Sequence, residues 1–161
     1  MIDSTSDTPL PLDEACTQLT GLLAGESDLI ANSANVSAFL AQQLADINWV
    51  GFYFLKGDTL LLGPFQGRPA CVRIPVGHGV CGTAVADNAT QVVDDVHAFP
   101  GHIACDIRSR SELVVPLCDG DRVVGVLDID SPRTGRFSAA DVGYVESLLD
   151  VFRRHQFDTA A

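Results

Sequence analysis

Two stretches that each read as a pair of strands joined by a tight turn constrain the fold of this chain most strongly. The first consists of residues 47–55 and 60–65, which are rich in aromatic and β-branched residues and flank a Gly-Asp turn. The second consists of residues 113–117 and 122–130, which flank an Asp-Gly turn. Strands joined by so short a connection run antiparallel, so the chain is predicted to build a central antiparallel sheet from two hairpins.

Apolar residues recur at helical spacing on both sides of these hairpins. A first helix is predicted from Leu12 to near Gly25, and Ser27 is predicted to cap a second. The last helix is predicted to begin at Ser138, with Asp141 completing a weak form of the capping box. This order predicts an α+β domain, with helices packed on one face of the sheet and a ligand pocket under the crossover loops on the other.

The bulk properties indicate one soluble globular domain and exclude some partners. We expect the domain to span residues 10–156 of the 161 and the polar residues 1–9 to be frayed. The net charge of −11 disfavours nucleic acid and anionic membranes, because both repel an acidic surface. The first residues lack the features of a signal peptide, and no apolar stretch is long enough to cross a bilayer, so we expect a cytoplasmic protein.

The segment between the hairpins holds three of the chain's five cysteines, Cys71, Cys81 and Cys105. Glycine, proline and histidine surround them, so the thiols are predicted to lie on turns and short elements. We expect a strand over residues 71–76, a helix over residues 81–87 and a strand over residues 91–93. Residues 94–111 show little periodicity, and a segment this long inside a compact domain is functional or disordered. Its apolar residues favour a functional segment.

An odd number of cysteines at uneven spacing in a reducing compartment is typical of catalytic or redox-sensing thiols. Cys105 is the candidate nucleophile, and the alternative is that it is a buried, inert cysteine. A thiolate that attacks an electrophilic oxygen or sulfur becomes a sulfenic acid, and a second thiol then condenses with it. Cys71 and Cys81 are both candidates for that second thiol. We expect Cys16 and Cys118 to be bystanders.

Three acidic residues occupy the second hairpin, although acidic residues are depleted from strands. Glu112 opens one strand, and Asp128 and Asp130 lie two apart near the end of the other, so they face the same side of the sheet. They are either solvated carboxylates at the strand end or a cluster that holds a cationic group. In such a cluster, like charges raise one pKa and leave that carboxyl protonated, able to donate to a leaving oxygen.

Trp49 and Tyr53 lie four apart on the first predicted strand and share a face. They are either core residues or a wall that packs against a small thioether or sulfoxide methyl group. A zinc site made of His97, His102 and Cys105 is a further alternative. Their spacing matches no structural zinc site, so we do not favour it.

These residues fall within a series of short motifs, and the match that the motifs carry runs from about residue 30 to residue 152. The motifs are Asn48-Trp-Val-Gly-Phe-Tyr53, Gly79-Val-Cys81-Gly-Thr-Ala, Asp95-Val-His97, Gly101-His-Ile-Ala-Cys105-Asp106, Ser111-Glu112 and Val126-Leu-Asp128-Ile-Asp130-Ser131. Together they resemble the GAF-domain free methionine-(R)-sulfoxide reductases. The cysteine triplet is the most specific part of the resemblance, because the Glu112 stretch and the last hairpin occur in GAF domains at large.

The resemblance implies a GAF fold and a role for each cysteine. Cys105 matches the nucleophile that takes the sulfoxide oxygen, Cys71 the main resolving cysteine and Cys81 a further redox cysteine. Free methionine sulfoxide would be the substrate and thioredoxin the external reductant, with no bound cofactor or metal. Family members are commonly homodimers. His78 is a departure, since lysine or arginine is expected there.

The resemblance also assigns the pocket residues. Glu112, Asp128 and Asp130 match the carboxylates that bind substrate and polarise the sulfoxide, and Glu112 and Asp130 would take part in catalysis. Trp49 and Tyr53 match the aromatic wall around the methyl group. The alternative function is a non-catalytic GAF module that binds a small ligand or senses redox state, because one fold can carry unrelated functions.

Overall fold

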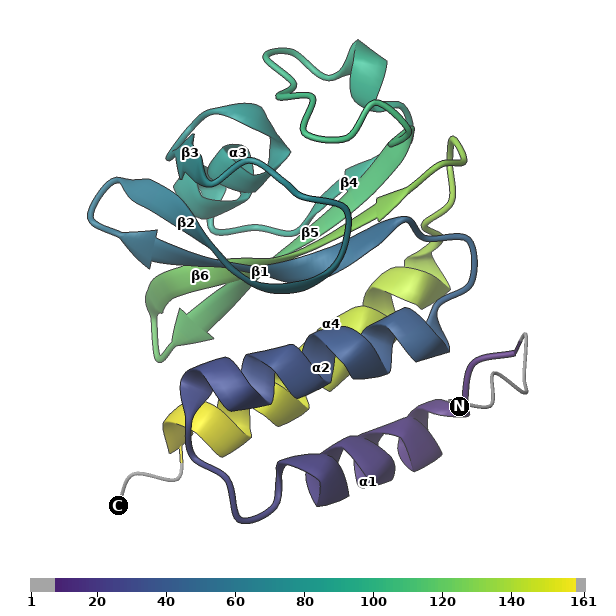
Figure 1. The fold of residues 1–161 in the computed structure, drawn as a ribbon, viewed down its shortest axis with the longest axis vertical. Helices are drawn as coiled ribbons and strands as arrows, with labels where there is room; N and C mark the ends of the chain where they lie inside the picture. The colour runs from purple at the N-terminus through teal and green to yellow at the C-terminus, as the bar shows by residue number, and fades with distance from the viewer. Residues whose placement is uncertain (1–7, 159–161) are drawn as a thin grey trace.

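The computed structural model describes residues 8–158 and builds them around one six-stranded antiparallel sheet. In their spatial order the strands are β3 (Arg73–Pro75), β2 (Thr59–Gly67), β1 (Trp49–Lys56), β6 (Arg122–Ser131), β5 (Ser111–Asp119) and β4 (Gln91–Val93). The two predicted hairpins are confirmed as β1–β2 and β5–β6. They join through the pairing of β1 with β6 at the centre of the sheet (Figure 1).

The helices are distributed unequally over the two faces of this sheet (Figure 1). The long helices α1 (Leu12–Leu23), α2 (Leu29–Gln43) and α4 (Ala139–Arg153) lie on one side, and α4 continues into a short π-helical segment, Arg154–Asp158. α2 and α4 pack on the sheet, and α1 packs on them as an outer layer. The short helix α3 (Gly79–Asp87), the 3₁₀ turn Val96–Ala98 and the crossover loops lie over the other face. The predicted α+β architecture is confirmed.

Alternation along β1 supplies the two faces with different side chains, as the period of two in a strand requires. Val50 and Phe52 point toward the long helices and belong to the main apolar core. In that core the ring centroids of Phe52 and Phe152 of α4 lie 5.1 Å apart. Trp49 and Tyr53 point to the opposite face and belong to a second apolar cluster that includes residues of α3. A single strand therefore contributes both to the core and to the face that carries the pocket.

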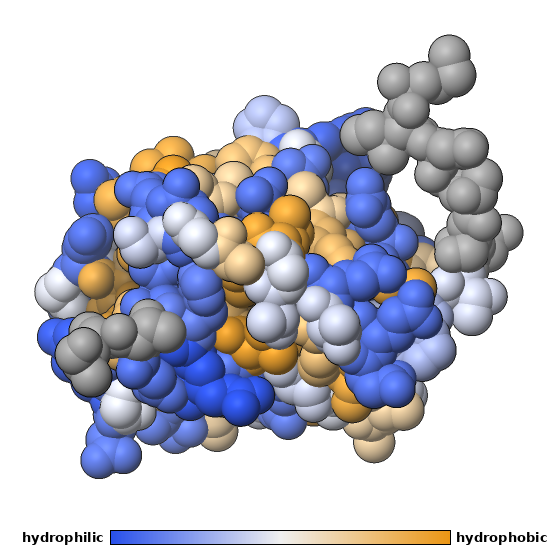
Figure 2. Space-filling model, turned by 90° about the horizontal axis from the view of Figure 1, so that it is seen from below, coloured by the Kyte–Doolittle hydropathy of each residue, from blue (hydrophilic) through white to orange (hydrophobic). Residues whose placement is uncertain are grey.

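The outer surface of the helical side is mostly hydrophilic around a band of apolar residues (Figure 2). α1 and α2 contribute exposed apolar side chains at Leu12, Leu22 and Ile30. Within residues 8–158, no helix combines the length and the apolar character that crossing a bilayer requires.

Hydrogen bonds at helix starts decide two of the sequence predictions. The second helix is capped by Asp28 and not by Ser27, because the Asp28 carboxylate accepts a 2.8 Å hydrogen bond from the backbone N–H of Ala31. The predicted capping box of the last helix is confirmed, since the side chains of Ser138 and Asp141 each accept from the other's backbone N–H.

The short elements of the crossover differ slightly from prediction. The strand expected over residues 71–76 is reduced to Arg73–Pro75, because Cys71 is held in the preceding loop by a disulfide and a hydrogen bond to its carbonyl oxygen. α3 begins two residues earlier than predicted, since the Gly82 N–H already donates to the His78 carbonyl at 3.1 Å. The expected fraying of residues 1–9 concerns mainly residues outside the described range, and the limits 10–156 remain a prediction.

Candidate active site

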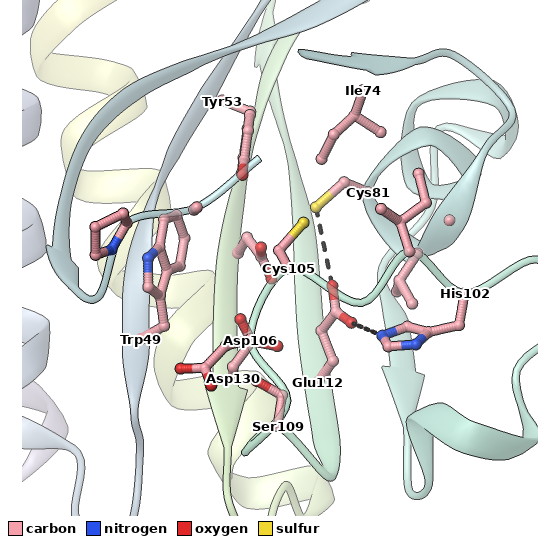
Figure 3. Close-up of a pocket in the computed structure, with 16 residues that line it drawn as sticks. Trp49, Tyr53, Ile74, Cys81, His102, Cys105, Asp106, Ser109, Glu112 and Asp130 are labelled. Atoms are coloured by element: carbon pink, nitrogen blue, oxygen red, sulfur yellow. Dashed lines mark hydrogen bonds and ion pairs between the residues drawn. The ribbon is translucent and has the colours of Figure 1, made fainter. Parts of the chain in front are cut away.

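A pocket on the sheet face opposite the long helices collects most of the residues singled out in the sequence (Figure 3). Its volume, including the open solvent at its mouth, is about 520 Å³. The site residues that line it are Trp49, Tyr53, Cys81, Cys105, Glu112, Asp128 and Asp130. The remaining one, Cys71, adjoins the pocket wall through its bond to Cys105. Residues far apart in the sequence are thus brought together as predicted.

Cys71 and Cys105 form a disulfide, with their Cα atoms 5.5 Å apart. Cys71 lies in the loop between β2 and β3, and Cys105 lies in the long loop that precedes β5. Cys81, the other candidate partner, is a buried free thiol in α3. The geometry therefore selects Cys71 as the partner of Cys105, in agreement with the resemblance.

The beginning of β1 anchors both cysteine-bearing loops. Tyr53 Oη donates a 2.8 Å hydrogen bond to the Cys71 carbonyl, and Trp49 Nε1 donates to the Arg68 carbonyl at 3.1 Å in the same loop. Asn48 Nδ2 lies 3.2 Å from Asp106 Oδ2, next to Cys105 in the sequence, and 3.2 Å from Ser109 Oγ. The aromatic residues thus hold the Cys71 loop in addition to lining the pocket.

Three carboxyl groups from two adjacent strands converge on the pocket. Glu112 of β5 lies directly opposite Asp130 of β6, and Asp128 follows two residues away on the same face. Asp128 also lies opposite Gly51 of β1, where a Cβ would collide with Phe65 of β2. The described lining residues include no lysine or arginine, and the buried Asp128 Oδ1 has no hydrogen-bond partner among the described residues. The cluster therefore has no built-in cation to neutralise it.

Burial controls the protonation of these carboxyl groups. Burial raises the pKa of Glu112 well above its usual range, and the negative charges of Asp128 and Asp130 raise it further. Burial also raises the pKa of Asp128 to about 6. The pKa of Asp130 is raised by burial and then by the negative charge of Asp128. By contrast, the side-chain hydrogen bond from Arg108 lowers the pKa of Asp106 to about 2. The cluster therefore retains protons near neutral pH, whereas Asp106 is ionised.

Cys81 belongs to this proton-holding cluster. Its Sγ lies 3.9 Å from Glu112 Oε1, and the donor atoms of Cys81, Glu112 and Asp128 all lie within 4.8 Å of one another. Burial, followed by the charge of Asp128, raises the pKa of Cys81, so it is a neutral thiol. Gly82 allows this placement, because a Cβ there would collide with the Pro75 carbonyl oxygen. An ammonium group or bound protons satisfy such a cluster, and its chemistry does not require a metal.

His102 lines the pocket beside Glu112, with its Nε2 atom 4.0 Å from Glu112 Oε2 (Figure 3). Burial lowers the pKa of His102, and the charge of His97 lowers it further. Within the described part of the chain, His97, His102 and Cys105 do not assemble as a metal site, and the Cys105 sulfur is already bonded to Cys71. The zinc alternative therefore has no support.

Comparison with known proteins agrees with this geometry. A family model described as GAF domain matches residues 31–152. The free methionine-R-sulfoxide reductase of Escherichia coli is 61% identical over 128 residues, which cover 80% of this chain and 78% of that protein. The chain belongs to the GAF-domain free methionine-R-sulfoxide reductases.

Solved structures of this reductase family superpose closely on the chain. The reduced fRMsr of Staphylococcus aureus has a TM-score of 0.88 and 49% identity, and the alignment covers 94% of this chain and 98% of that one. The Neisseria meningitidis reductase in complex with its substrate has a TM-score of 0.85 and 44% identity, with coverage of 89% and 87%. The predicted family and fold are confirmed, while the roles of individual residues remain predictions.

Sequence reasoning did not assign two residues that the structure places at the site of this family member. Asn48 is only the first residue of a motif in the sequence, yet it holds the loop of Cys105. His102 is predicted only as a sequence neighbour of Cys105 and as an unfavoured zinc ligand, yet it lies beside Glu112. A signal for His102 existed, because it lies three residues before the candidate nucleophile. No comparable sequence signal points to Asn48, because its hydrogen-bond partners Asp106 and Ser109 are distant in the sequence.

Proposed function

We propose that this chain reduces free L-methionine (R)-S-oxide to L-methionine, with the Cys71 and Cys105 thiols as electron donors. The observation that carries the proposal is the disulfide between these cysteines at the wall of a pocket that holds protonated carboxyls and has no lysine or arginine among its described lining residues. The E. coli relative is named for this activity, and the S. aureus and N. meningitidis structures include complexes with substrate.

The sulfoxide end of the substrate would lie between the aromatic wall and Glu112. The rings of Trp49 and Tyr53 are stacked with their centroids 5.9 Å apart, a surface suited to a methyl group and a polarisable sulfur. The raised pKa of Glu112 leaves its carboxyl protonated, so that it donates a hydrogen bond to the sulfoxide oxygen.

The amino-acid end of the substrate would use two oppositely charged features. Its ammonium group would neutralise Asp128 and Asp130, which have no cationic partner among the described lining residues. Its carboxylate would accept hydrogen bonds at the start of α3, where Gly79 lines the pocket and His78 provides no side-chain cap. A peptide-bound methionine sulfoxide lacks both charges, so this arrangement favours the free amino acid.

The proposed chemistry transfers one oxygen atom and two electrons. The Cys105 thiolate attacks the sulfoxide, the bond between the methionine sulfur and its oxygen breaks, and the oxygen passes to Cys105 with a proton from Glu112. Methionine sulfur is thereby reduced and Cys105 is oxidised to a sulfenic acid. The Cys71 thiol then attacks the sulfenic sulfur, which forms the disulfide and releases water.

A dithiol reductant must return the disulfide to two thiols before the next cycle, and we assign this role to thioredoxin. We also propose a homodimer in the cytoplasm, with no bound cofactor. Size-exclusion chromatography with light scattering tests the homodimer. A coupled assay with thioredoxin tests the reductant.

The direct test of the function is NADPH consumption coupled through thioredoxin reductase and thioredoxin, with each sulfoxide epimer separately. The R epimer of the free amino acid is expected to be reduced, whereas the S epimer and N-acetylmethionine sulfoxide are not. Lack of turnover of the R epimer by the fully reduced protein would reject the proposal.

The Cys105→Ser variant separates this function from the non-catalytic alternative. For an enzyme, the variant loses turnover but still binds methionine sulfoxide, as calorimetry would measure. A sensing module would bind ligand equally in wild type and variant, and neither protein would reduce it.

A further inference from the structure

The proposed function requires a proton at Glu112 in every cycle, and the structure restricts how that proton is replaced. Glu112 gives one proton to the departing sulfoxide oxygen, and it is left as a carboxylate in a site that disfavours its charge. The Glu112 side chain is only 9% exposed. A bound substrate would cover it further on the pocket side, so direct protonation from bulk water is hindered.

The titratable neighbours of Glu112 differ in their contact with solvent. Cys81 and Asp128 are 3% and 6% exposed and face the pocket interior, and Asp130 would be occupied by the substrate ammonium. His102 lies on the opposite side of Glu112 from Asp130 and Cys105 (Figure 3). Its side chain is 15% exposed, and its Nε2 atom is 4.0 Å from Glu112 Oε2. It is therefore the neighbour that connects the carboxyl with the outside when substrate fills the pocket.

We propose that His102 relays protons between solvent and Glu112 during turnover. After the oxygen transfer, neutral His102 takes a proton from solvent and gives the proton on Nε2 to the Glu112 carboxylate. His102 is then neutral again, and the carboxyl is ready for the next sulfoxide. His102 acts through Glu112 and does not touch the reacting atoms, so it is a positioning residue.

Two properties of the pair favour this transfer. Glu112 has a raised pKa and His102 a lowered one, so a proton on His102 passes readily to the Glu112 carboxylate. The separation of 4.0 Å exceeds a hydrogen bond, so transfer needs a small rotation of the imidazole or one bridging water. His102 lies on the loop between the 3₁₀ turn and β5.

The test compares the first turnover with later ones in the His102→Ala variant. Reduced protein already carries a proton on Glu112, so the first disulfide should form at close to the wild-type rate in a quenched-flow experiment. Continued turnover, with the dithiol reductant raised until the rate no longer depends on it, should fall by at least about tenfold in weakly buffered medium. Added imidazole should restore it, because the free base can enter the vacated space and carry the proton.

Two further variants keep the proposal falsifiable. His102→Gln retains a hydrogen-bonding side chain but cannot relay a proton, so it should be as slow as His102→Ala. His97→Ala is the matched control, because this exposed histidine lies next to His102, with ring centroids 6.4 Å apart, and should turn over normally.

The possible outcomes separate the relay from the function on which it rests. Normal continued turnover in His102→Ala, recovery by His102→Gln, or failure of imidazole to restore the rate would each overturn the relay alone. If wild-type protein forms no disulfide with methionine sulfoxide, the proposed function fails first and the relay fails with it.

Discussion

The two faces of the sheet bury different kinds of side chain on the same strands. On the helical face, Leu113 and Ile129 pack into a wholly apolar cluster. On the pocket face, their neighbours along the chain include the buried acids Glu112 and Asp128. Burying an ionisable group costs free energy unless its charge is neutralised. Protonation removes the charge of Glu112, whereas Asp128, with a pKa of about 6, still ionises at neutral pH. The helical face thus provides stability, and the pocket face sacrifices some of it to keep acids in a reactive state.

The largest effect should follow from replacing the acid at the centre of the pocket. Glu112→Gln should lower turnover by about 10²- to 10⁴-fold, because the amide cannot donate a proton to the sulfoxide oxygen. Its stability in urea should stay equal to that of wild type, since the amide resembles the protonated carboxyl in shape and charge. If Glu112→Gln kept its activity but lost more than about 1 kcal/mol in the free energy of unfolding, Glu112 would serve stability and not catalysis.

The next largest effect lies on the other face. Phe52→Ala should reduce the free energy of unfolding by about 3–5 kcal/mol, because it opens a cavity next to Phe152 in the main core. Urea titration of the reduced protein measures this loss. At low temperature, where the variant stays folded, disulfide formation should keep its wild-type rate. A loss smaller than about 1 kcal/mol would show that the helical face is not the main source of stability.

A smaller effect is expected on the way the free energy of unfolding depends on pH. The pKa of Asp128 rises from 3.8 in the unfolded chain to about 6 in the folded one, so the folded state binds this proton more tightly. The stability that this group contributes is complete below the unfolded pKa and is lost as pH rises through the folded pKa.

Asp128→Asn should therefore gain stability relative to wild type between about pH 4 and about pH 7, because the amide never ionises. Urea unfolding across this range measures the difference. Substitution of the exposed Asp87 by Asn removes the same formal charge from the surface and serves as the matched control. A difference between Asp128→Asn and wild type that stays constant with pH would contradict the prediction.

The smallest effect is expected from removing a tyrosine hydroxyl. The chain has two tyrosines, one on each side of the sheet, so the two removals can be compared. Tyr53→Phe removes the hydrogen bond to the Cys71 carbonyl, so it should cost about 0.5–1.5 kcal/mol and slow disulfide formation a few-fold. The matched control is Tyr144→Phe in α4, whose hydroxyl has no hydrogen-bond partner in the described structure. Rapid alkylation followed by mass spectrometry would give the rates. Equal rates for the two variants would argue against loop anchoring by Tyr53.

Local patterns were sufficient to predict much of this architecture. The alternation that places Asp128 and Asp130 on one face needs only the period of a strand, and the turns of both hairpins are encoded by adjacent residues. The start of α4 was also local, because Ser138 and Asp141 are near neighbours that cap each other. Asp28 caps α2 in place of the predicted Ser27, because a sequence pattern does not locate a helix start to within one residue.

Long-range packing decided the rest. The choice between Cys71 and Cys81 depends on how two loops cross the sheet, so residue spacing could not make it. The same holds for Asn48, whose partner Asp106 comes from another loop, and for the distance between His102 and Glu112. The raised pKa of Glu112 required knowledge of its burial, which the sequence could only suggest through crowding of acids.

The single tryptophan of this chain lies in the pocket wall, where Trp49 is stacked on Phe65 with centroids 5.2 Å apart and is tied to the loop that precedes Cys71. All indole emission from the protein therefore originates a short way from the sulfur chemistry, and none from the remote helical layer adds background. The molecule carries its own optical probe, so filling of the cavity and closure of the thiol pair can be followed in real time without attaching a dye.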